Sequence, residues 1–270
     1  MPQRPLRIGW FTAGRGLGSR GMFEHTVQAI QNGSLNARLE FVFMHRERGE
    51  GEGSDAFMDR AAELDIPVAA LSAARFREQR GGKFAEHRGA YDQQVLGLLD
   101  SYAPDICVLA GYLLIMSPLL THAFPCVNLH PALPDGPIGL WQKVIWELID
   151  SRAEESGLMT FLVTDDLDKG PPISYARFSL RGPRFDSLWS GVGGRDAQSL
   201  REVEGEEHPL FAAIRREGLR REPLLVLETL KAFAGGDVSV SDRAIRGREG
   251  APLAPRDLTG QVDAALVAEG

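Results

Sequence analysis

Residues 126–134 form an apolar run that ends in a proline-broken loop, and they carry two polar side chains, Asn128 and His130. Alternate side chains of a strand project from the same face, so this amide and this imidazole would lie together. A second apolar run, 158–163, leads into an acidic loop that contains Asp168 and ends in Gly-Pro-Pro. We expect this loop to bring Asp168 back toward the end of the first strand.

These three groups suit acyl or formyl transfer to an amine without a covalent enzyme intermediate. Near pH 7 the imidazole of His130 can accept or deliver a proton. The carboxylate of Asp168 can set the imidazole tautomer, raise its pKa or hold a relaying water. The amide of Asn128 can donate to an oxygen that becomes negative in a tetrahedral intermediate. The spacing alone fits equally a turn with a structural histidine and a solvated acidic loop, so both interpretations stay open at this point.

Four segments resemble the signatures of the folate-dependent formyltransferases. Residues 128–134, Asn-Leu-His-Pro-Ala-Leu-Pro, are similar to that family's Asn-x-His-Pro-Ser-Leu-Leu-Pro motif. Residues 163–171, Val-Thr-Asp-Asp-Leu-Asp-Lys-Gly-Pro, resemble its Thr-Asp-Glu-Leu-Asp-Gly-Gly-Pro loop. Segments 102–112 and 115–118 also resemble family segments. Their order and spacing match best the branch that formylates glycinamide ribonucleotide.

The resemblance is strong over about residues 100–175, weaker over 6–100 and faint after 180. It implies transfer of a formyl group from 10-formyltetrahydrofolate to a primary amine, by analogy glycinamide ribonucleotide of purine biosynthesis. The catalytic residues that it implies are Asn128, His130 and Asp168. The folate-binding residues that it implies are Leu113, Leu114, Ile115, Met116, Val163, Thr164 and Asp165. Leu114 stands where family members often have a basic residue.

A glycine-rich loop, 12–21, separates an apolar strand from a helix predicted over 22–31. This order presents backbone N–H groups and a helix N-terminus to an anion. In the resembling family the loop holds the substrate phosphate through Gly-x-Gly-Ser-Asn, and here Gly14, Arg15 and Gly16 match before an apparent insertion. The family asparagine is absent, and Arg15, Ser19 or Arg20 would serve instead. A tight turn that needs positive φ explains the same glycines.

One further substrate residue comes from the resemblance alone. A helix of the family supplies a carboxylate to the amine substrate, and Glu217 lies one residue from the aligned position, Gly218.

The order of apolar and helical segments predicts an α/β fold with a mainly parallel, twisted sheet flanked by helices, which by resemblance is the Rossmann-like formyltransferase fold. Residues 1–235 would form the catalytic domain, with a phosphate-binding half over about 1–100 and a folate-binding, catalytic half over about 101–235. Residues 236–270 would form a poorly structured tail with a short helix at 258–267. Segments 75–86 and 181–205 are predicted as loops, and the second would either cover the active site or be an insertion without a role.

Composition narrows the functional classes. The formal net charge of −7 argues against a general nucleic-acid binder, and no apolar run is long enough for a membrane span. Cys107 and Cys126 lie in apolar runs without metal-ligand spacing, which indicates reduced thiols in a cytoplasmic protein and no metal site. We expect small-molecule partners, an amine and a folate, and a monomer or homodimer.

Three alternatives remain from the sequence. The same side chains could direct water at the formyl group, as in a formyltetrahydrofolate hydrolase, although such relatives usually carry an N-terminal regulatory domain and none precedes Leu6. The altered glycine-rich loop keeps open a formyltransferase for another amine, such as an amino sugar nucleotide. A ligand-binding relative without catalysis is disfavoured because Asn128, His130 and Asp168 are all retained.

Overall fold

The computed structural model describes residues 4–167 and 169–269, so Asp168 lies outside the described residues. The chain divides into two compact units. Unit 1 comprises the chain up to Asn128 together with Leu162–Pro171 and Thr229–Leu253. Unit 2 comprises Leu129–Phe161, Pro172–Glu228 and the chain from Ala254 onward.

Unit 1 is built on parallel strands that are apolar along most of their length. β1 pairs in parallel with β2 on one side and with β4 on the other, β3 pairs with β2, and β5 pairs with β4. Their bounds are β1 (Leu6–Thr12), β2 (Ala37–Met44), β3 (Val68–Ala70), β4 (Ile106–Leu109) and β5 (Cys126–His130). Helices cover both faces of such a sheet, which explains why its central strands are not amphipathic.

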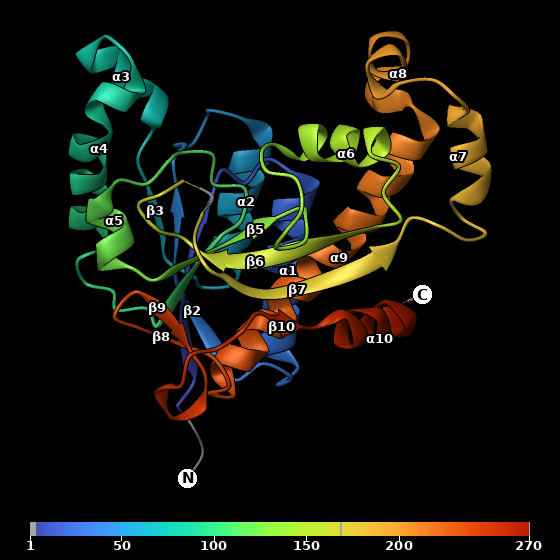
Figure 1. The fold of residues 1–270 in the computed structure, drawn as a ribbon. Helices are drawn as coiled ribbons and strands as arrows, with labels where there is room; N and C mark the ends of the chain where they lie inside the picture. The colour runs from blue at the N-terminus through green and yellow to red at the C-terminus, as the bar shows by residue number, and fades with distance from the viewer. Residues whose placement is uncertain (1–3, 168, 270) are drawn as a thin grey trace. The chain divides into compact units, whose positions relative to one another are not determined.

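The helices of unit 1 pack on the two faces of this sheet. They are α1 (Leu17–Gln31), α2 (Glu52–Glu63), α3 (Ala73–Arg80), α4 (Phe84–Leu99) and α5 (Pro118–Ala123). Adjacent residues of β1 point to opposite faces of the sheet. On one face, the ring centroid of Trp10 lies 5.5 Å from that of Phe23 in α1. Phe11 instead joins the apolar cluster that contains Tyr91 of α4 and Leu120 of α5. Figure 1 shows α3, α4 and α5 together along one side of unit 1.

Unit 2 contains an antiparallel pair and most of the remaining helices. β6 (Glu155–Leu162) and β7 (Pro172–Ser179) are antiparallel, and β10 (Arg256–Asp257) extends them in parallel with β7. The helices are α6 (Trp141–Asp150), α7 (Asp186–Val192), α8 (Ala197–Val203), the 3₁₀ turn η1 (Gly205–Glu207), α9 (Pro209–Ala234) and α10 (Thr259–Glu269). Ring contacts hold the helical core, such as Trp146 against Phe211 at 4.8 Å.

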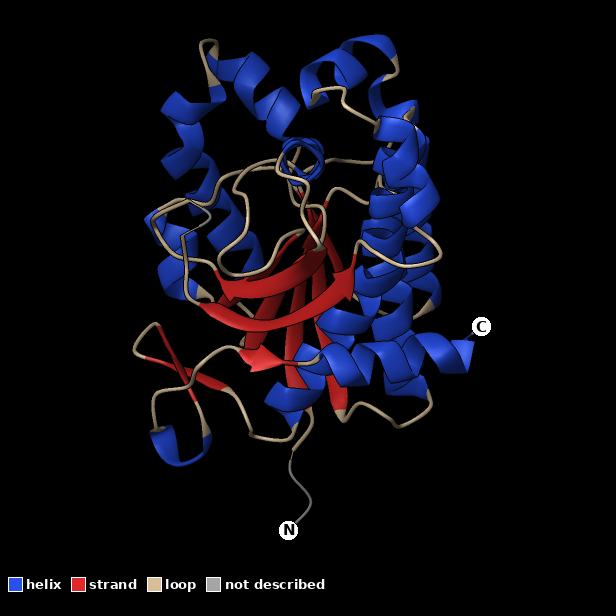
Figure 2. Cartoon of the chain, turned by 45° about the vertical axis from the view of Figure 1, so that its right-hand side comes forward, coloured by secondary structure: helices blue, strands red, loops and turns tan. Residues whose placement is uncertain are grey.

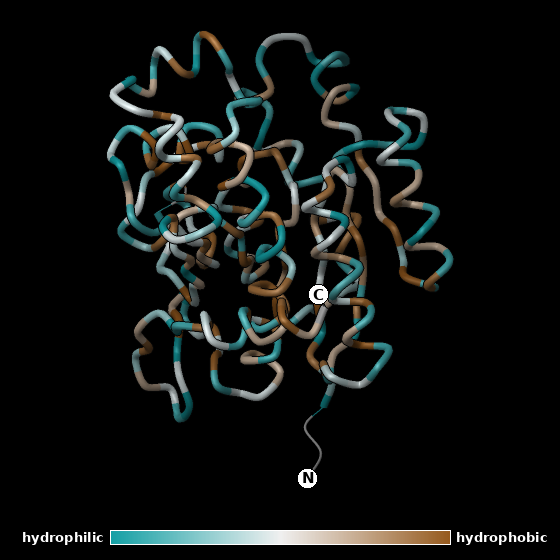
Figure 3. The backbone as a smooth tube through the Cα atoms, turned by 90° about the vertical axis from the view of Figure 1, so that its right-hand side faces the viewer, coloured by the Kyte–Doolittle hydropathy of each residue, from teal (hydrophilic) through white to brown (hydrophobic). Residues whose placement is uncertain are grey.

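The strand order of the larger sheet is β10-β7-β6-β5-β4-β1-β2-β3. The parallel pairs outnumber the antiparallel β6–β7 pair among the described pairings, so the prediction of an α/β fold with a mainly parallel sheet is confirmed. Hydropathy alternates along the helices, as brown and teal in Figure 3, which is expected of helices that bury one side.

Two segments predicted as loops are largely helical. Segment 75–86 contains most of α3 and the start of α4, and the Oγ atom of Ser72 caps α3 by accepting from the backbone N–H of Arg75. Segment 181–205 contains α7 and α8, and the carboxylate of Asp196 caps α8 through the N–H of Ser199 at 2.7 Å. The helix α8 is too short to show a clear hydrophobic periodicity. It is stabilised by its polar cap and by a few buried side chains such as Leu200.

The C-terminal residues also carry more structure than the tail predicted over 236–270. Besides α10, which matches the predicted short helix, they form β10 and a hairpin of β8 (Ser239–Ser241) and β9 (Ala244–Arg246), followed by η2 (Arg248–Gly250). Figure 2 shows this hairpin as a separate two-stranded ladder. Leu258 and Val262 are buried, so a few apolar residues suffice to order the segment.

The long helix α9 contains Pro223 in its interior and continues through it. Leu224 and Leu225 next to it are buried, and their packing outweighs the lost backbone hydrogen bond. Within the described part of the chain, no helix is both long and apolar enough to cross a membrane.

Candidate functional site

The glycine-rich loop follows β1 at the carboxyl edge of the unit 1 strands. Gly14 has a φ of +68°, and its N–H donates to Thr12 Oγ1 at 2.9 Å. A Cβ atom at Gly14 would lie 2.8 Å from Met44 Cε and from Phe57 Cβ. Both the backbone conformation and the surrounding space therefore require glycine here, as the tight-turn interpretation predicts.

The same loop leads into the N-terminus of α1, which begins without a side-chain cap. Gly16 is the N-cap residue and offers no side-chain oxygen to the first-turn N–H groups. Ser19 is buried, and its hydroxyl donates to the carbonyl oxygen of Gly16 at 2.9 Å. Arg15 is exposed, whereas Arg20 donates to the carbonyl of Gly53. Uncapped N–H groups beside an exposed arginine can bind an anion such as a phosphate by donating hydrogen bonds to it.

Two polar side chains at this edge were missed by the sequence analysis, His45 and Tyr112. Each directly follows the end of an apolar strand or its turn, which is the signal that would have identified them. Their rings meet edge to face with centroids 5.1 Å apart, and neither His45 Nδ1 nor Tyr112 Oη has a hydrogen-bond partner among the described residues. Burial lowers the pKa of His45 from 6.5 to about 4, so its imidazole is neutral near pH 7.

The four side chains of segment 113–116, which is predicted to bind folate, differ in their solvent exposure. Leu113 is 71% exposed and Ile115 is 40% exposed, whereas Met116 is buried. Leu114 is partly buried against the apolar cluster of unit 1 that also contains Met116. Only Leu113 and Ile115 therefore present apolar surface that an apolar ligand could cover.

The acidic loop 163–171 is held by contacts within unit 1. The N–H of Val163 donates to the carbonyl of Cys126 at 2.8 Å, and the hydroxyl of Thr164 donates to the carbonyl of Asp166 at 3.2 Å. Asp165 accepts from Thr121 Oγ1 at 2.6 Å and has further contacts described below. Thr164 and Asp165 thus stabilise the loop itself.

Asn128 and His130 both lie in β5, where strand geometry directs alternate side chains to the same side. Asn128 is paired with Leu109 of β4 in the sheet register. His130 is buried, and its Nε2 lies 2.9 Å from the carbonyl oxygen of Pro137. A carbonyl oxygen can only accept, so Nε2 carries the hydrogen, and in the neutral imidazole Nδ1 is the nitrogen that can take a proton.

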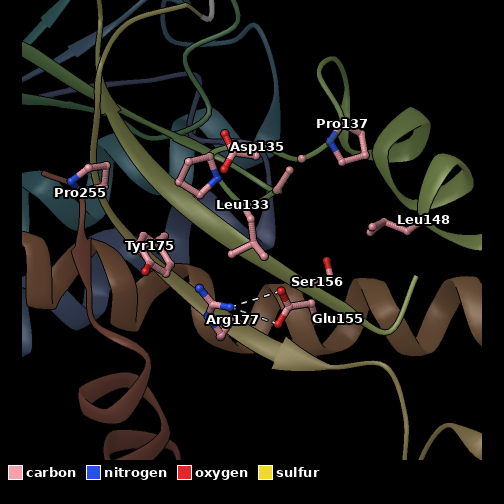
Figure 4. Close-up of a pocket in the computed structure, with 12 residues that line it drawn as sticks. Leu133, Asp135, Pro137, Leu148, Glu155, Ser156, Tyr175, Arg177 and Pro255 are labelled. Carbon is pink, nitrogen blue, oxygen red and sulfur yellow. Dashed lines mark hydrogen bonds and ion pairs between the residues drawn. The ribbon is translucent and has the colours of Figure 1, made fainter. Parts of the chain in front are cut away.

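A cavity of about 540 Å³ lies beside the loop that follows His130, within unit 2. Figure 4 shows Leu133, Asp135 and Pro137 of this loop facing Tyr175 and Arg177 across it. The cavity was not predicted from the sequence. Its arginine is already paired, since Arg177 Nη1 lies 3.3 Å from Glu155 Oε1, so the cavity offers no unpaired cation to an anionic ligand.

Glu217, predicted to contact the amine, lies in α9 among arginines. Its Oε2 accepts from Arg221 Nη1 at 2.6 Å, and its Oε1 lies 3.3 Å from Arg184 Nη1. These arginines hold the pKa of Glu217 below its usual value despite partial burial. The carboxylate is therefore engaged by cations of its own unit, and its contact with an amine stays a prediction.

Comparisons with known proteins show the family of the chain. A sequence model of the family described as "Formyl transferase" matches residues 16–180, more than half of the chain. The phosphoribosylglycinamide formyltransferase of Escherichia coli (strain K12) is 27% identical over 200 residues, which cover 73% of this chain and 81% of the relative. The enzyme of the same name from Schizosaccharomyces pombe is 26% identical over 165 residues, which cover 58% of this chain and 76% of the relative.

Solved structures share the fold at lower identity. A phosphoribosylglycinamide formyltransferase from Coxiella burnetii superposes with a TM-score of 0.64 at 22% identity, covering 94% of this chain and 99% of that one. A formyltetrahydrofolate deformylase from Pseudomonas syringae pv. tomato gives a TM-score of 0.62 at 17% identity, covering 90% of this chain and 65% of that one.

Proposed function

Because the chain belongs to the formyl transferase family, we propose that it transfers a formyl group from 10-formyltetrahydrofolate to glycinamide ribonucleotide. The relatives whose names specify this acceptor align with most of the chain, which supports the acceptor. The observation that carries the proposal is the pair on β5. His130, with Nε2 committed to a backbone carbonyl, shares one side of this strand with Asn128.

The proposed reaction needs a hydrogen-bond donor and a proton carrier. The acceptor amine attacks the formyl carbon, and the negative charge moves to the formyl oxygen, where the Asn128 amide donates a hydrogen bond. The amine then loses a proton, and N10 of the folate gains one as its bond to carbon breaks. His130 carries this proton through Nδ1, because Nε2 is already hydrogen-bonded. Asp168, whose role rests on the loop motif alone, would orient His130 or a water.

The folate is proposed to bind at the apolar surface of unit 1. Leu113 and Ile115 are exposed, as is Leu167 of the acidic loop at 56%. The family resemblance assigns segment 113–116 and the 163–165 part of the acidic loop to the folate, and these exposed side chains supply apolar surface there. They can pack against the flat faces of the pterin and benzoyl rings of a folate. Thr164 and Asp165 would act by shaping the loop that carries Leu167.

The acceptor phosphate is proposed to bind at the N-terminus of α1. Gly14 and Gly16 let the backbone approach closely, and Arg15 adds an exposed positive charge. Ser19 supplies its backbone N–H, because its hydroxyl is already donated to Gly16.

A panel of acceptors tests the proposal. Purified protein and 10-formyltetrahydrofolate would be incubated with glycinamide ribonucleotide, an amino sugar nucleotide or no amine, and formylated products would be identified by mass spectrometry. Formylation of glycinamide ribonucleotide with the highest kcat/KM supports the proposal. Preference for the amino sugar nucleotide would replace the acceptor, and formate release without an amine would indicate a hydrolase.

A further inference from the structure

Arg243 joins the C-terminal hairpin to the acidic loop within unit 1. It lies at the turn between β8 and β9, and its Nη2 is 2.9 Å from Asp165 Oδ1. Its Nη1 also contacts Nε2 of His122. No pattern in the sequence connects the hairpin with this loop.

Asp165 has contacts with two separate segments, the helix α5 and the turn between β8 and β9. Besides Arg243, it accepts from Thr121 Oγ1 at 2.6 Å, and its Oδ2 lies 3.0 Å from His122 Nε2. The hydrogen bonds from Thr121 and Arg243 hold the pKa of Asp165 well below its usual range. The carboxylate is therefore ionised near neutral pH.

The hairpin turn has an unusual sequence for its conformation. Asp242 and Arg243 have φ values of +51° and +59°, the arrangement of a tight turn that favours Asn-Gly. A non-glycine residue such as arginine is disfavoured at positive φ. The presence of arginine at this position is explained if its side chain is needed at the loop.

We propose that Arg243 is a positioning residue: by holding Asp165 it fixes the acidic loop in the conformation that binds folate. This inference rests on the proposed function of the loop. A purely stabilising role is disfavoured by exposure, because the side chains of Arg243 and Asp165 are 45% and 39% exposed. Ion pairs this exposed contribute little to global stability. Their effect should instead appear in the order of the loop.

The variants Arg243→Ala and Arg243→Lys test the inference. Arg248→Ala is the matched control, since Arg248 pairs with Asp237 at 2.6 Å in the same C-terminal region and makes no described contact with Asp165. Binding of the stable analogue 10-formyl-5,8-dideazafolate would be titrated, and amide hydrogen exchange of the 163–171 loop would be measured in the unliganded proteins.

We expect Arg243→Ala to raise the Kd of the analogue by about fivefold and to speed exchange in the loop. Arg243→Lys should recover part of both effects, and Arg248→Ala should match wild type. The folate KM should rise while the acceptor KM does not. Unchanged Kd and unchanged exchange in Arg243→Ala would overturn the inference.

Failure of the proposed function is distinguishable from failure of this inference. If wild-type protein does not bind the analogue, the assignment of the loop to folate is wrong. Hydrogen exchange then still decides whether Arg243 orders the loop. Faster exchange in Arg243→Ala alone supports this effect, and equal exchange in all variants refutes it.

Discussion

The Nε2 atom of His130 donates its hydrogen to the carbonyl oxygen of Pro137, 2.9 Å away. This contact assigns the tautomer of the imidazole and leaves Nδ1 to carry a proton. We predict that His130→Ala lowers kcat by about 100-fold or more, while the variant still unfolds cooperatively at a lower midpoint, because a buried side chain and its hydrogen bond to Pro137 are lost. Initial rates and thermal unfolding would be compared with His87→Ala, which removes a half-buried histidine of α4. Turnover near that of wild type would exclude the proton-carrying role.

The loop that contains Pro137 depends on a close approach at Gly157. A Cβ atom there would lie 2.4 Å from Leu133 Cδ2 and 2.5 Å from the carbonyl oxygen of Ala176. We predict that Gly157→Ala lowers the free energy of unfolding by about 1–3 kcal/mol, because the backbone oxygen cannot move aside.

Gly97→Ala is the matched control for Gly157→Ala. Gly97 lies in α4, and a Cβ atom added there would have nothing within 4 Å, so alanine should stabilise the protein by roughly 0.5–1 kcal/mol. Denaturant unfolding measures both changes. Equal effects of the two substitutions would contradict the packing argument at Gly157.

Because of His45, the free energy of unfolding depends on pH. Its pKa is lowered from 6.5 to about 4 in the folded protein because it is buried, so the unfolded chain takes up this proton first as the pH falls. The stabilisation is complete above pH 6.5 and is lost between pH 6.5 and 4. We predict that wild type loses about 3 kcal/mol more over this interval than His45→Gln does.

Urea unfolding at several pH values measures this difference, and His87→Gln, at a half-buried histidine of α4, serves as the control. A parallel fall in the stabilities of wild type and His45→Gln would show that His45 is not protonated only on unfolding.

Leu113 tests the folate surface. The side chain is 71% exposed, so its truncation should not disturb the core. We predict that Leu113→Ala raises the folate KM by about fivefold, because roughly 1 kcal/mol of apolar burial on binding is lost, and leaves the acceptor KM unchanged. Leu98→Ala, at an exposed leucine of α4, is the control. Steady-state kinetics with each substrate varied in turn would reveal a rise in both constants, which would disagree with the assignment.

The parts of the fold that the sequence predicts are those with strong local signals. β1 is a mostly apolar run and β4 a continuous one, and the glycine-rich loop before α1 contains a position, Gly14, that only glycine can occupy. The short helices α7 and α8 lack such a signal, because α7 has a few buried side chains and no side-chain cap, and α8 has the Asp196 cap and a few buried side chains. Local pattern does not encode these tertiary contributions.

The residues of the candidate site also differ in how far the sequence predicts them. Asn128 and His130 are predicted by their spacing in one strand, and the family resemblance gives them roles. The partner of His130 is a backbone carbonyl, which has no sequence signature, and the contact of Asp165 with Arg243 joins segments that are distant in the chain. His45 and Tyr112 were missed because a single polar residue after a strand is a weak signal, and burial gives it meaning.

The most direct test of the account is the absorbance of the folate product with and without glycinamide ribonucleotide. Purified protein would be mixed with 10-formyltetrahydrofolate, and the reaction would be started by the amine. The account predicts product only after the amine is added, and at least about 100-fold more slowly with His130→Ala. Product formation at the same rate without the amine, or none with it, would contradict formyl transfer to this acceptor.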